Sequence, residues 1–390
     1  MTSIEHQLRE ELRRTADQVQ PGQLRPLRAP KRARRWLPVA AVGTAGVATS
    51  IAIGIAVATG AAPVSRQSTV PPSADSSMPR YYVTVQDVSR QLTATVRDSS
   101  TGKVTGTVVV ADQSSVCGWQ IAGAADDQHF VINDITGCDL PGSSDGTLYT
   151  LTVAADGRPS QPVKLAEPAD QVTGMGLSPD GSMLALSQLN GSPLNKQPYG
   201  GVEVVNLVTG ATSTLSLRSE PGYWPGLPQW SDGNRVVSVP WWHSTTAYTA
   251  GADVVGVRQF AVSGPGQTLH EGTLRLLPTP IALSSALVVN GGETIIGSVC
   301  TQQKGQPDAA TARVDELSLA SPPIIHQLRA QSIRNRDAGD AVQSQCSVLS
   351  ADPGGQHVLI QAFTFGRLDN GTFTPLPGLT PRIGFVAAAW

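Results

Sequence analysis

The segment Val172–Leu186, with the sequence VTGMGLSPDGSMLAL, decides the fold because it places one tight turn between two short apolar runs. The runs Val172–Leu177 and Met183–Leu186 have the length of β-strands and are short for helices. The turn Ser178-Pro179-Asp180-Gly181 contains the Asp-Gly pair that is typical of a hairpin. The segment therefore predicts two antiparallel strands.

Two further strands follow this hairpin and complete a four-stranded unit. Val202–Leu207 and Thr212–Leu217 flank the turn Thr209-Gly210. The same order recurs around the turn Trp230-Ser231-Asp232-Gly233, which indicates a repeat fold. The strands of this second unit are Arg235–Val239, Val257–Val262 and Thr273–Leu277.

Related turns recur along the chain about 50 to 65 residues apart, a spacing within reach of propeller repeats. They are Asp126-Asp127, Asn290-Gly291-Gly292 and Pro353-Gly354-Gly355. A sixth unit is split, because Tyr81–Val110 supplies three strands and Phe385–Trp390 resembles the innermost strand that ends in Trp230. Joining them closes a ring and removes a free sheet edge. We therefore expect an all-β, six-bladed β-propeller over residues 80–390, with five or seven blades as the alternatives.

The turns Ser178-Pro179-Asp180-Gly181 and Trp230-Ser231-Asp232-Gly233 resemble those of WD-repeat-like and TolB-type β-propellers. The resemblance covers most of residues 80–390. A basic, anchored N-terminus followed by a degenerate propeller also resembles membrane-anchored surface proteins of high-GC Gram-positive, actinobacterial-type bacteria. These resemblances imply a fold and a location, and they imply no activity.

The composition supports an all-β fold and excludes nucleic acid as an expected partner. Only 15% of the residues are charged, and the 39 Gly and 29 Pro favour short strands and many turns. Beyond residue 62 the chain holds 19 of the 28 basic and 26 of the 30 acidic side chains, a net charge of −7. Phosphate binding needs clustered Lys and Arg, so an acidic domain argues against it.

The N-terminal part predicts a single membrane anchor. Residues 36–62 carry no charge and are long enough to span the ~30 Å hydrocarbon core as a transmembrane helix. The basic run at residues 31–35 precedes them, so the positive-inside rule places residues 1–35 in the cytoplasm and the propeller outside. Residues 63–79 are rich in Ser and Pro and predict a flexible linker.

The N-terminal part has two further features, a signal-peptidase pattern and a short helical stub. Ala56-Val57-Ala58 fits a signal-peptidase site, which makes a cleaved signal peptide the alternative to a retained anchor. The basic region before it is long for a signal peptide, which favours the anchor. Residues 3–19 predict a short helical stub that ends at Pro21-Gly22.

The repeat phase suggests two disulfides. Because loops of an antiparallel blade alternate between two faces, it places Cys117 near Cys138, and Cys300 near Cys346 on adjacent blades. All four cysteines lie on the outward side of the predicted anchor, where disulfides persist. The alternatives are free thiols or a four-cysteine metal site, but the sequence has no C-x-x-C spacing.

An aromatic cluster is the predicted ligand site. The longest expected loops gather on one face, and variable loops on a rigid scaffold often bind ligands. We call this face the loop-rich face; its segments are 188–200, 219–228, 240–256, 299–312 and 331–344. The candidate residues on it are Tyr223, Trp224, Trp241, Trp242 and His243. They could stack on sugar rings or anchor a protein partner, or they could simply pack over the end of a sheet. Trp230 and Trp390 are expected in the core of the inner strands.

Catalytic chemistry has little support in the sequence. Gly142, Ser144 and Gly146 match G-x-S-x-G, but a nucleophile elbow needs a strand-to-helix turn and a hairpin is expected here. The six His are scattered without a metal-binding spacing, so the sequence predicts no metal and no cofactor. We expect a non-catalytic, membrane-tethered module that binds an extracellular protein or glycan through the loop-rich face. The alternative is a hydrolase-like surface enzyme with a site near the pore, formed by acids such as Asp337 and Asp340.

Overall fold

The structure, a computed structural model, describes most of the C-terminal 313 residues of the chain. The described ranges are 78–88, 91–112, 116–136, 145–166, 171–190, 199–217, 220, 222–243, 252–263, 268–303, 306–320, 324–334, 346–376 and 387–390. The predicted stub (1–35), transmembrane helix (36–62) and most of the linker (63–79) lie outside them. Within the described ranges, no helix has the length and apolar character needed to cross a membrane.

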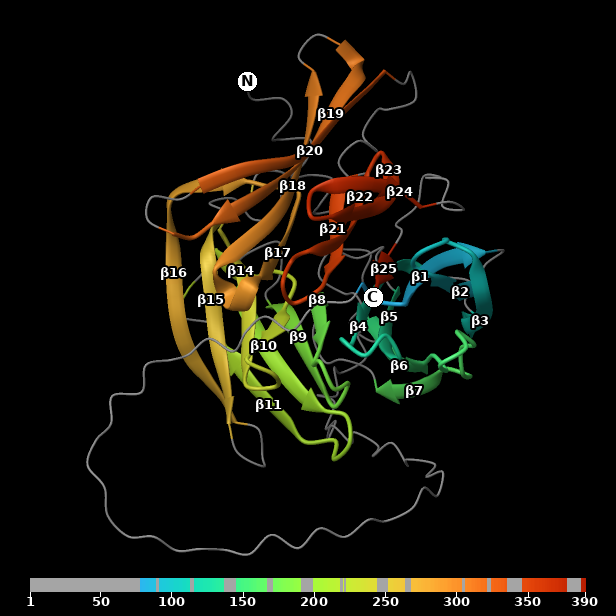
Figure 1. Cartoon of the computed structure of the whole chain (residues 1–390). Helices are drawn as coiled ribbons and strands as arrows, with labels where there is room; N and C mark the ends of the chain where they lie inside the picture. Colours follow the sequence, from blue (N-terminus) through green and yellow to red (C-terminus); the bar gives the residue numbers. More distant parts are fainter. Residues whose placement is uncertain are drawn as a thin grey trace, which may run out of the picture. The chain divides into compact units, whose positions relative to one another are not determined.

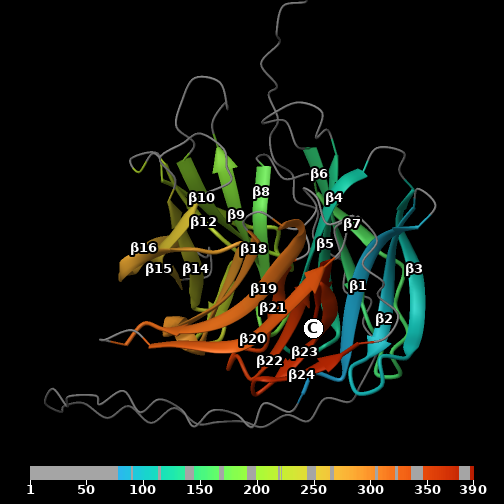
Figure 2. The same cartoon turned by 90° about the horizontal axis from the view of Figure 1, so that it is seen from above.

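The described residues form six antiparallel sheets, which we number as blades from the N-terminus (Figures 1 and 2). Blade 1 contains β25 (Ala387–Ala389), β1 (Tyr81–Val88), β2 (Gln91–Asp98) and β3 (Val104–Asp112), and blade 2 contains β4 (Val116–Gly123), β5 (His129–Thr136), β6 (Asp145–Thr152) and β7 (Val163–Ala166). Blade 3 contains β8 (Gln171–Leu177), β9 (Met183–Asn190), β10 (Tyr199–Asn206) and β11 (Thr212–Ser216).

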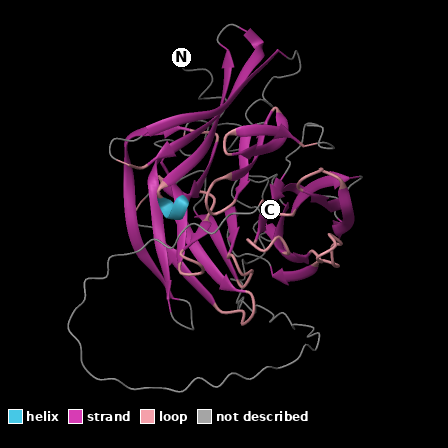
Figure 3. Ribbon diagram, viewed as in Figure 1, coloured by secondary structure: helices cyan, strands magenta, loops and turns pink. Residues whose placement is uncertain are grey.

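The other three blades follow the same order from the innermost strand outward. Blade 4 contains β12 (Tyr223–Pro225) and β13 (Gln229–Ser231), which both pair with β14 (Val236–His243), then β15 (Asp253–Ser263) and β16 (Thr268–Ala282). Blade 5 contains β17 (Ser285–Val289), β18 (Thr294–Gln303), β19 (Gln306–Ser318) and β20 (Ile324–Arg334), and blade 6 contains β21 (Cys346–Ala351), β22 (His357–Ala362), β23 (Thr364–Asp369) and β24 (Thr372–Pro375). The single helical turn in the described ranges is η2 (Asn290–Gly292), drawn in cyan in Figure 3.

The six sheets close into a ring, which confirms the predicted six-bladed β-propeller. Each innermost strand contacts the innermost strand of the next blade, and β25 contacts both β21 and β4. Six clusters of buried apolar side chains fill the spaces between neighbouring blades, one cluster per pair of blades. The hydrophobic core is therefore distributed between the blades, as expected when each sheet packs one face on each neighbour.

The chain closes the ring with its C-terminal strand, as the sequence predicted. β25 pairs with β1 in antiparallel register, with Val83 opposite Ala389 and Val85 opposite Ala387. Figure 1 shows β25 beside β1 although the two strands come from opposite ends of the described chain. The Trp390 ring meets the Tyr82 ring edge-on at 6.4 Å, which adds an aromatic contact between blade 1 and its closing strand.

Small residues let the inner strands approach each other closely. A Cβ atom added at Gly123 would collide with the main-chain oxygen of Trp390, and one at Gly176 would collide with the Pro228 carbonyl. These two positions lie on β4 and β8, at the boundaries with the next inner strands. Close backbone approach at these points therefore requires glycine.

The structure corrects the predicted extent of the loops on the loop-rich face. The segment 240–243 belongs to strand β14, and the neighbouring segments 188–190 and 299–303 belong to β9 and β18. The predicted strand ended at Val239, but β14 continues through Pro240, which lies where its inner partner changes from β13 to β12. A missing backbone N–H is tolerated at such a break in the hydrogen-bond ladder.

Candidate functional site

Two short strands bring the predicted aromatic residues together at one end of blade 4. β12 pairs with the end of β14, so that Tyr223 lies opposite His243 and Trp224 lies opposite Trp242. The Tyr223 ring stacks on Trp241 at 6.2 Å with an interplanar angle of 13°, and it contacts His243 at 4.3 Å. Tyr223, Trp241 and His243 therefore form one aromatic cluster, whereas Trp242, opposite Trp224, packs on the other side of β14. The role of all five residues in ligand binding stays a prediction.

A buried arginine, Arg258, packs against the Trp241 ring. The Arg258 guanidinium lies 4.7 Å from the centre of the Trp241 ring, and its Nη1 donates to both carboxylate oxygens of Glu220 at 2.7 Å. Only 1% of Trp241 is exposed, so its faces are covered by protein atoms. Trp242 is half-buried and packs against the apolar cluster between blades 4 and 5. This arrangement fits packing over the sheet end, because the Trp241 ring is inaccessible.

The two tryptophans predicted in the inner strands are buried, as expected. Trp230 is 6% exposed and its Nε1 donates to the Gly176 carbonyl at 2.9 Å, which ties blade 4 to blade 3. Trp390 is 4% exposed and packs between blades 1 and 6.

A cavity of about 590 Å³ lies at the centre of the ring. Every blade contributes to its lining through the innermost strand or the turn that follows it. One lining residue from each blade, taken in chain order around the ring from blade 2, is Ile121, Met175, Trp230, Leu287, Leu349 and Trp390. This volume is in the range of small-molecule sites, which are typically apolar cavities with a few polar groups.

Two carboxylates line the cavity on the turns that follow inner strands. Asp127 lies between β4 and β5; its Oδ2 accepts a hydrogen bond from the Arg80 N–H at 2.6 Å. Burial raises the pKa of Asp127 to about 6; the Arg80 hydrogen bond partly offsets this rise and the neighbouring Asp126 charge adds to it. Its Oδ1 is buried and has no hydrogen-bond partner among the described residues.

The second carboxylate, Asp352, is more deeply buried. It lies between β21 and β22 and is 6% exposed. Its Oδ1 accepts a hydrogen bond from the His357 N–H at 2.6 Å. Its Oδ2 is buried and, within the described part of the chain, has no hydrogen-bond partner. The cavity therefore has largely apolar walls, and two of its lining residues each carry a buried carboxylate oxygen that the described structure leaves unsatisfied.

The sequence indicated these turns but did not single out their carboxylates. Asp127 belongs to the predicted turn Asp126-Asp127, and Asp352 directly precedes the predicted turn Pro353-Gly354-Gly355; Asp is common in such turns and by itself indicates no site. The signal that could have found them is a comparison of equivalent turns within the repeat. Asp352 stands where blade 3 has Ser178, and Asp127 stands where blade 3 has Gly181.

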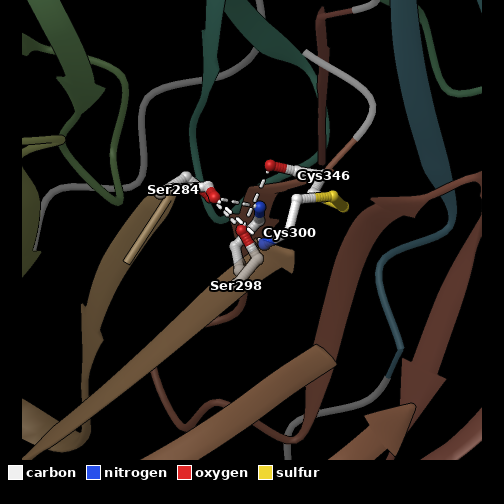
Figure 4. Close-up of a disulfide and its surroundings, with 6 residues drawn as sticks. Ser284, Ser298, Cys300 and Cys346 are labelled. Carbon is white, nitrogen blue, oxygen red and sulfur yellow. Dashed lines mark hydrogen bonds between the residues drawn. A yellow bond between two sulfur atoms is a disulfide. The ribbon is translucent and has the colours of Figure 1, made fainter. Parts of the chain in front are cut away.

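One of the two predicted disulfides is present in the structure. Cys300 on β18 and Cys346 on β21 are bonded, with their Cα atoms 5.8 Å apart, so the bond joins blades 5 and 6 (Figure 4). Around it, Ser284 Oγ accepts from the Cys300 N–H at 3.2 Å, and Ser298 Oγ donates to the Cys346 carbonyl at 3.2 Å. The Cys117–Cys138 pairing lies outside the described side chains.

The structure describes only some of the other residues that the sequence offered for catalysis or metal binding. Gly146 is in strand β6, the second strand of a hairpin with β5, which agrees with the expected hairpin. Gly142, Ser144, Asp337 and Asp340 lie outside the described residues. Within the described ranges, no group of three or more His, Cys, Asp or Glu is placed to hold a metal ion.

No protein-family model matches the chain, and no curated protein matches its sequence. Among solved structures, the chain is similar to a periplasmic gluconolactonase of Pseudomonas aeruginosa, with 13% identity, a TM-score of 0.40, and coverage of 79% of this chain and 99% of that one. It is also similar to a chain of a nidogen/laminin complex, with 8% identity, a TM-score of 0.45, and coverage of 79% and 97%. A third is the β-propeller domain of the trilobed protease from Pyrococcus furiosus, with 8% identity, a TM-score of 0.31, and coverage of 66% and 70%. These values are too low to transfer any activity to this chain.

Proposed function

We propose that the protein is a membrane-tethered, outward-facing module that binds a ligand without catalysing a reaction, and that the ligand occupies the central cavity. The observation that carries this proposal is the cavity itself, about 590 Å³ in volume and lined by residues of all six blades. A site built on the inner strands of a closed ring is rigid. Rigidity favours affinity because little conformational entropy is lost when the site binds a ligand.

The proposed site differs from the aromatic cluster that the sequence favoured. The Tyr223 ring stacks on the Trp241 ring, and the Arg258 guanidinium also lies over the Trp241 ring. A ligand would have to displace these contacts before it could stack on the Trp241 ring. We therefore place the small-molecule ligand in the cavity and keep the loop-rich face as the surface for a protein or glycan partner.

The proposed location rests on the sequence and on one structural observation. Residues 36–62 are apolar and uncharged, and the basic run 31–35 precedes them. The Cys300–Cys346 disulfide supports a domain that folds outside the reducing cytosol. A surface-biotinylation experiment on intact cells tests this: the propeller should be labelled without lysis. Labelling only after lysis would refute the outward orientation.

The binding function is tested by a small-molecule screen on full-length protein, using thermal shift first and calorimetry on the hits. Gln229 lines the cavity and is only half-buried, so Gln229→Trp should obstruct the site. Trp224→Ala serves as the matched control among the predicted aromatic residues. We expect hits whose binding is lost in Gln229→Trp and retained in Trp224→Ala. The opposite pattern would move the ligand to the aromatic cluster, and chemical conversion of a bound hit would favour the enzyme alternative.

A further inference from the structure

We propose that the central cavity takes a ligand with a protonated amine, which Asp352 and Asp127 hold while the apolar part of the ligand contacts the inner strands. This inference rests on the proposed function, because it names the ligand class of the same cavity.

The turn at Asp352 does not need a carboxylate at that position. Three blades share a turn in which the backbone N–H of one residue donates to the carbonyl five positions later: Ala124 to His129 at 2.8 Å, Ser178 to Met183 at 2.8 Å, and Asp352 to His357 at 3.0 Å. The first position is Ala in blade 2, where Asp126 Oδ1 accepts from the His129 N–H at 3.1 Å, and it is Ser in blade 3. A carboxylate at the first position is therefore not required by the turn.

The hydrogen bonds of these turns satisfy the side chain in blade 3 but not in blade 6. In blade 3, Ser178 Oγ accepts from the Met183 N–H at 2.9 Å and donates to Asp180 at 2.8 Å, which satisfies the hydroxyl. In blade 6, Asp352 Oδ1 alone caps the turn. Its Oδ2 is left buried without a partner in the described structure. A buried, unsatisfied carboxylate oxygen is costly, and a cationic donor bound in the cavity would remove that cost.

Asp127 also departs from the repeat. At the equivalent position blades 3 and 6 have Gly181 and Gly355, with φ of 69° and 68°. Asp127 adopts a φ of 58° at this position. A side chain in this left-handed region costs energy that glycine avoids, and such strain concentrates at functional sites. Its Oδ1 also lacks a partner among the described residues. Both departures from the repeat thus add a carboxylate to the same cavity.

The lining favours an organic amine over a bare metal ion. Asp127 and Asp352 are its two carboxylates, and none of the described lining residues is Lys or Arg, so the charge of this site is negative. Ca²⁺ takes six to eight oxygen ligands, whereas a primary ammonium needs at most three acceptors. The walls include large apolar side chains such as Met175, Leu227 and Leu287. An ammonium group on an apolar body matches both parts of the lining.

The test is calorimetric titration of full-length protein with 2-phenylethylamine and hexylamine, each compared with its neutral alcohol, 2-phenylethanol or hexan-1-ol. Asp352→Ser copies the blade 3 residue and keeps a group that can cap the turn, and Asp127→Gly copies the blade 3 and blade 6 residue. Asp156→Ser is the matched control, because it removes a turn carboxylate outside the cavity. Asp352→Asn is a second variant in case Asp352→Ser folds poorly.

We expect the amines to bind at least about tenfold more tightly than the alcohols. Asp352→Ser and Asp127→Gly should each weaken amine binding about tenfold, while Asp156→Ser leaves it unchanged. Equal binding of amines and alcohols, or unchanged binding in both cavity variants, would overturn the inference. If Gln229→Trp still abolishes binding of these compounds, the cavity remains the binding site and only the proposed preference for an amine is refuted. Failure of the wild type to bind either amine, or tight Ca²⁺ binding that Asp352→Ser abolishes, would also overturn the amine inference.

Discussion

Removal of the Cys300–Cys346 disulfide should destabilise the propeller by about 4 kcal/mol. The bond closes a loop with a sequence separation of 46, which contains the two outer strands of blade 5. The loop-closure relation for a cross-linked unfolded chain gives about 4 kcal/mol at 25 °C for this length. Cys346 is 1% exposed, so the loss of its packing adds to this value.

The assay is urea unfolding of the Cys300→Ala/Cys346→Ala double variant, followed by tryptophan fluorescence and circular dichroism. Substitution is preferred to a reductant, because a reductant would also act on Cys117 and Cys138. Ser298→Ala is the control: it removes the hydrogen bonds to the Cys346 carbonyl and to Ser285 Oγ and should cost about 2 kcal/mol. A double variant within about 1 kcal/mol of the wild type would refute the assignment of interblade stability to this bond.

Three further perturbations test other parts of the structure. Trp241→Ala should cost about 3–5 kcal/mol in urea unfolding because the ring is fully buried, whereas the partly exposed Trp224 should cost about 1 kcal/mol when changed to Ala; equal costs would contradict the packing described for the cluster. Ala388→Arg would place an unpaired charge in the closing strand and should cost about 3–5 kcal/mol by the same measurement; an unchanged midpoint would argue against closure by β25. The folded-state pKa of Asp127, about 6, lies above its ordinary value of 3.8, so this carboxyl favours the folded state below pH 3.8 and that contribution is lost as the pH rises to about 6. Stability measured from pH 4 to pH 7 should therefore fall more steeply in the wild type than in Asp127→Asn, and parallel curves would refute the raised pKa.

The architecture was predictable because turns and apolar runs are local signals. Ser178-Pro179-Asp180-Gly181 and Trp230-Ser231-Asp232-Gly233 lie at hairpins between inner and second strands, as predicted. Closure was predictable for a different reason: a ring with three strands at one end of the chain needs an inner strand from the other end. The apolar Phe385–Trp390 was the segment available for it, and Ala387–Ala389 forms that strand.

The extent of β14 could not be predicted in the same way. The predicted strand ended at Val239, and a Pro within a strand pattern usually argues against a central strand. The structure permits Pro240 because the inner partner changes there from β13 to β12. That change depends on the link between blades 3 and 4, which is a tertiary feature. The burial of Trp241 depends on the same change of partner, so it could not be predicted from the sequence either.

The two carboxylates of the cavity could not be identified as part of a site from the sequence alone. The sequence shows that Asp127 and Asp352 are in turns, but it does not show which of their oxygens the fold satisfies. That depends on the Arg80 and His357 N–H groups and on burial by neighbouring blades. Alignment of the turns by their five-residue hydrogen bond reveals both as departures from the repeat, and this alignment needs the observed register.

The most direct test of the central claim, that the ligand lies in the central cavity, is calorimetric titration of 2-phenylethylamine into full-length wild type and Gln229→Trp. Circular dichroism first establishes that both proteins are equally folded. The structure predicts saturable binding to the wild type and no measurable binding to Gln229→Trp, because the indole would occupy the cavity that Gln229 lines. Equal binding by the two proteins would contradict the claim and place the ligand elsewhere on the propeller.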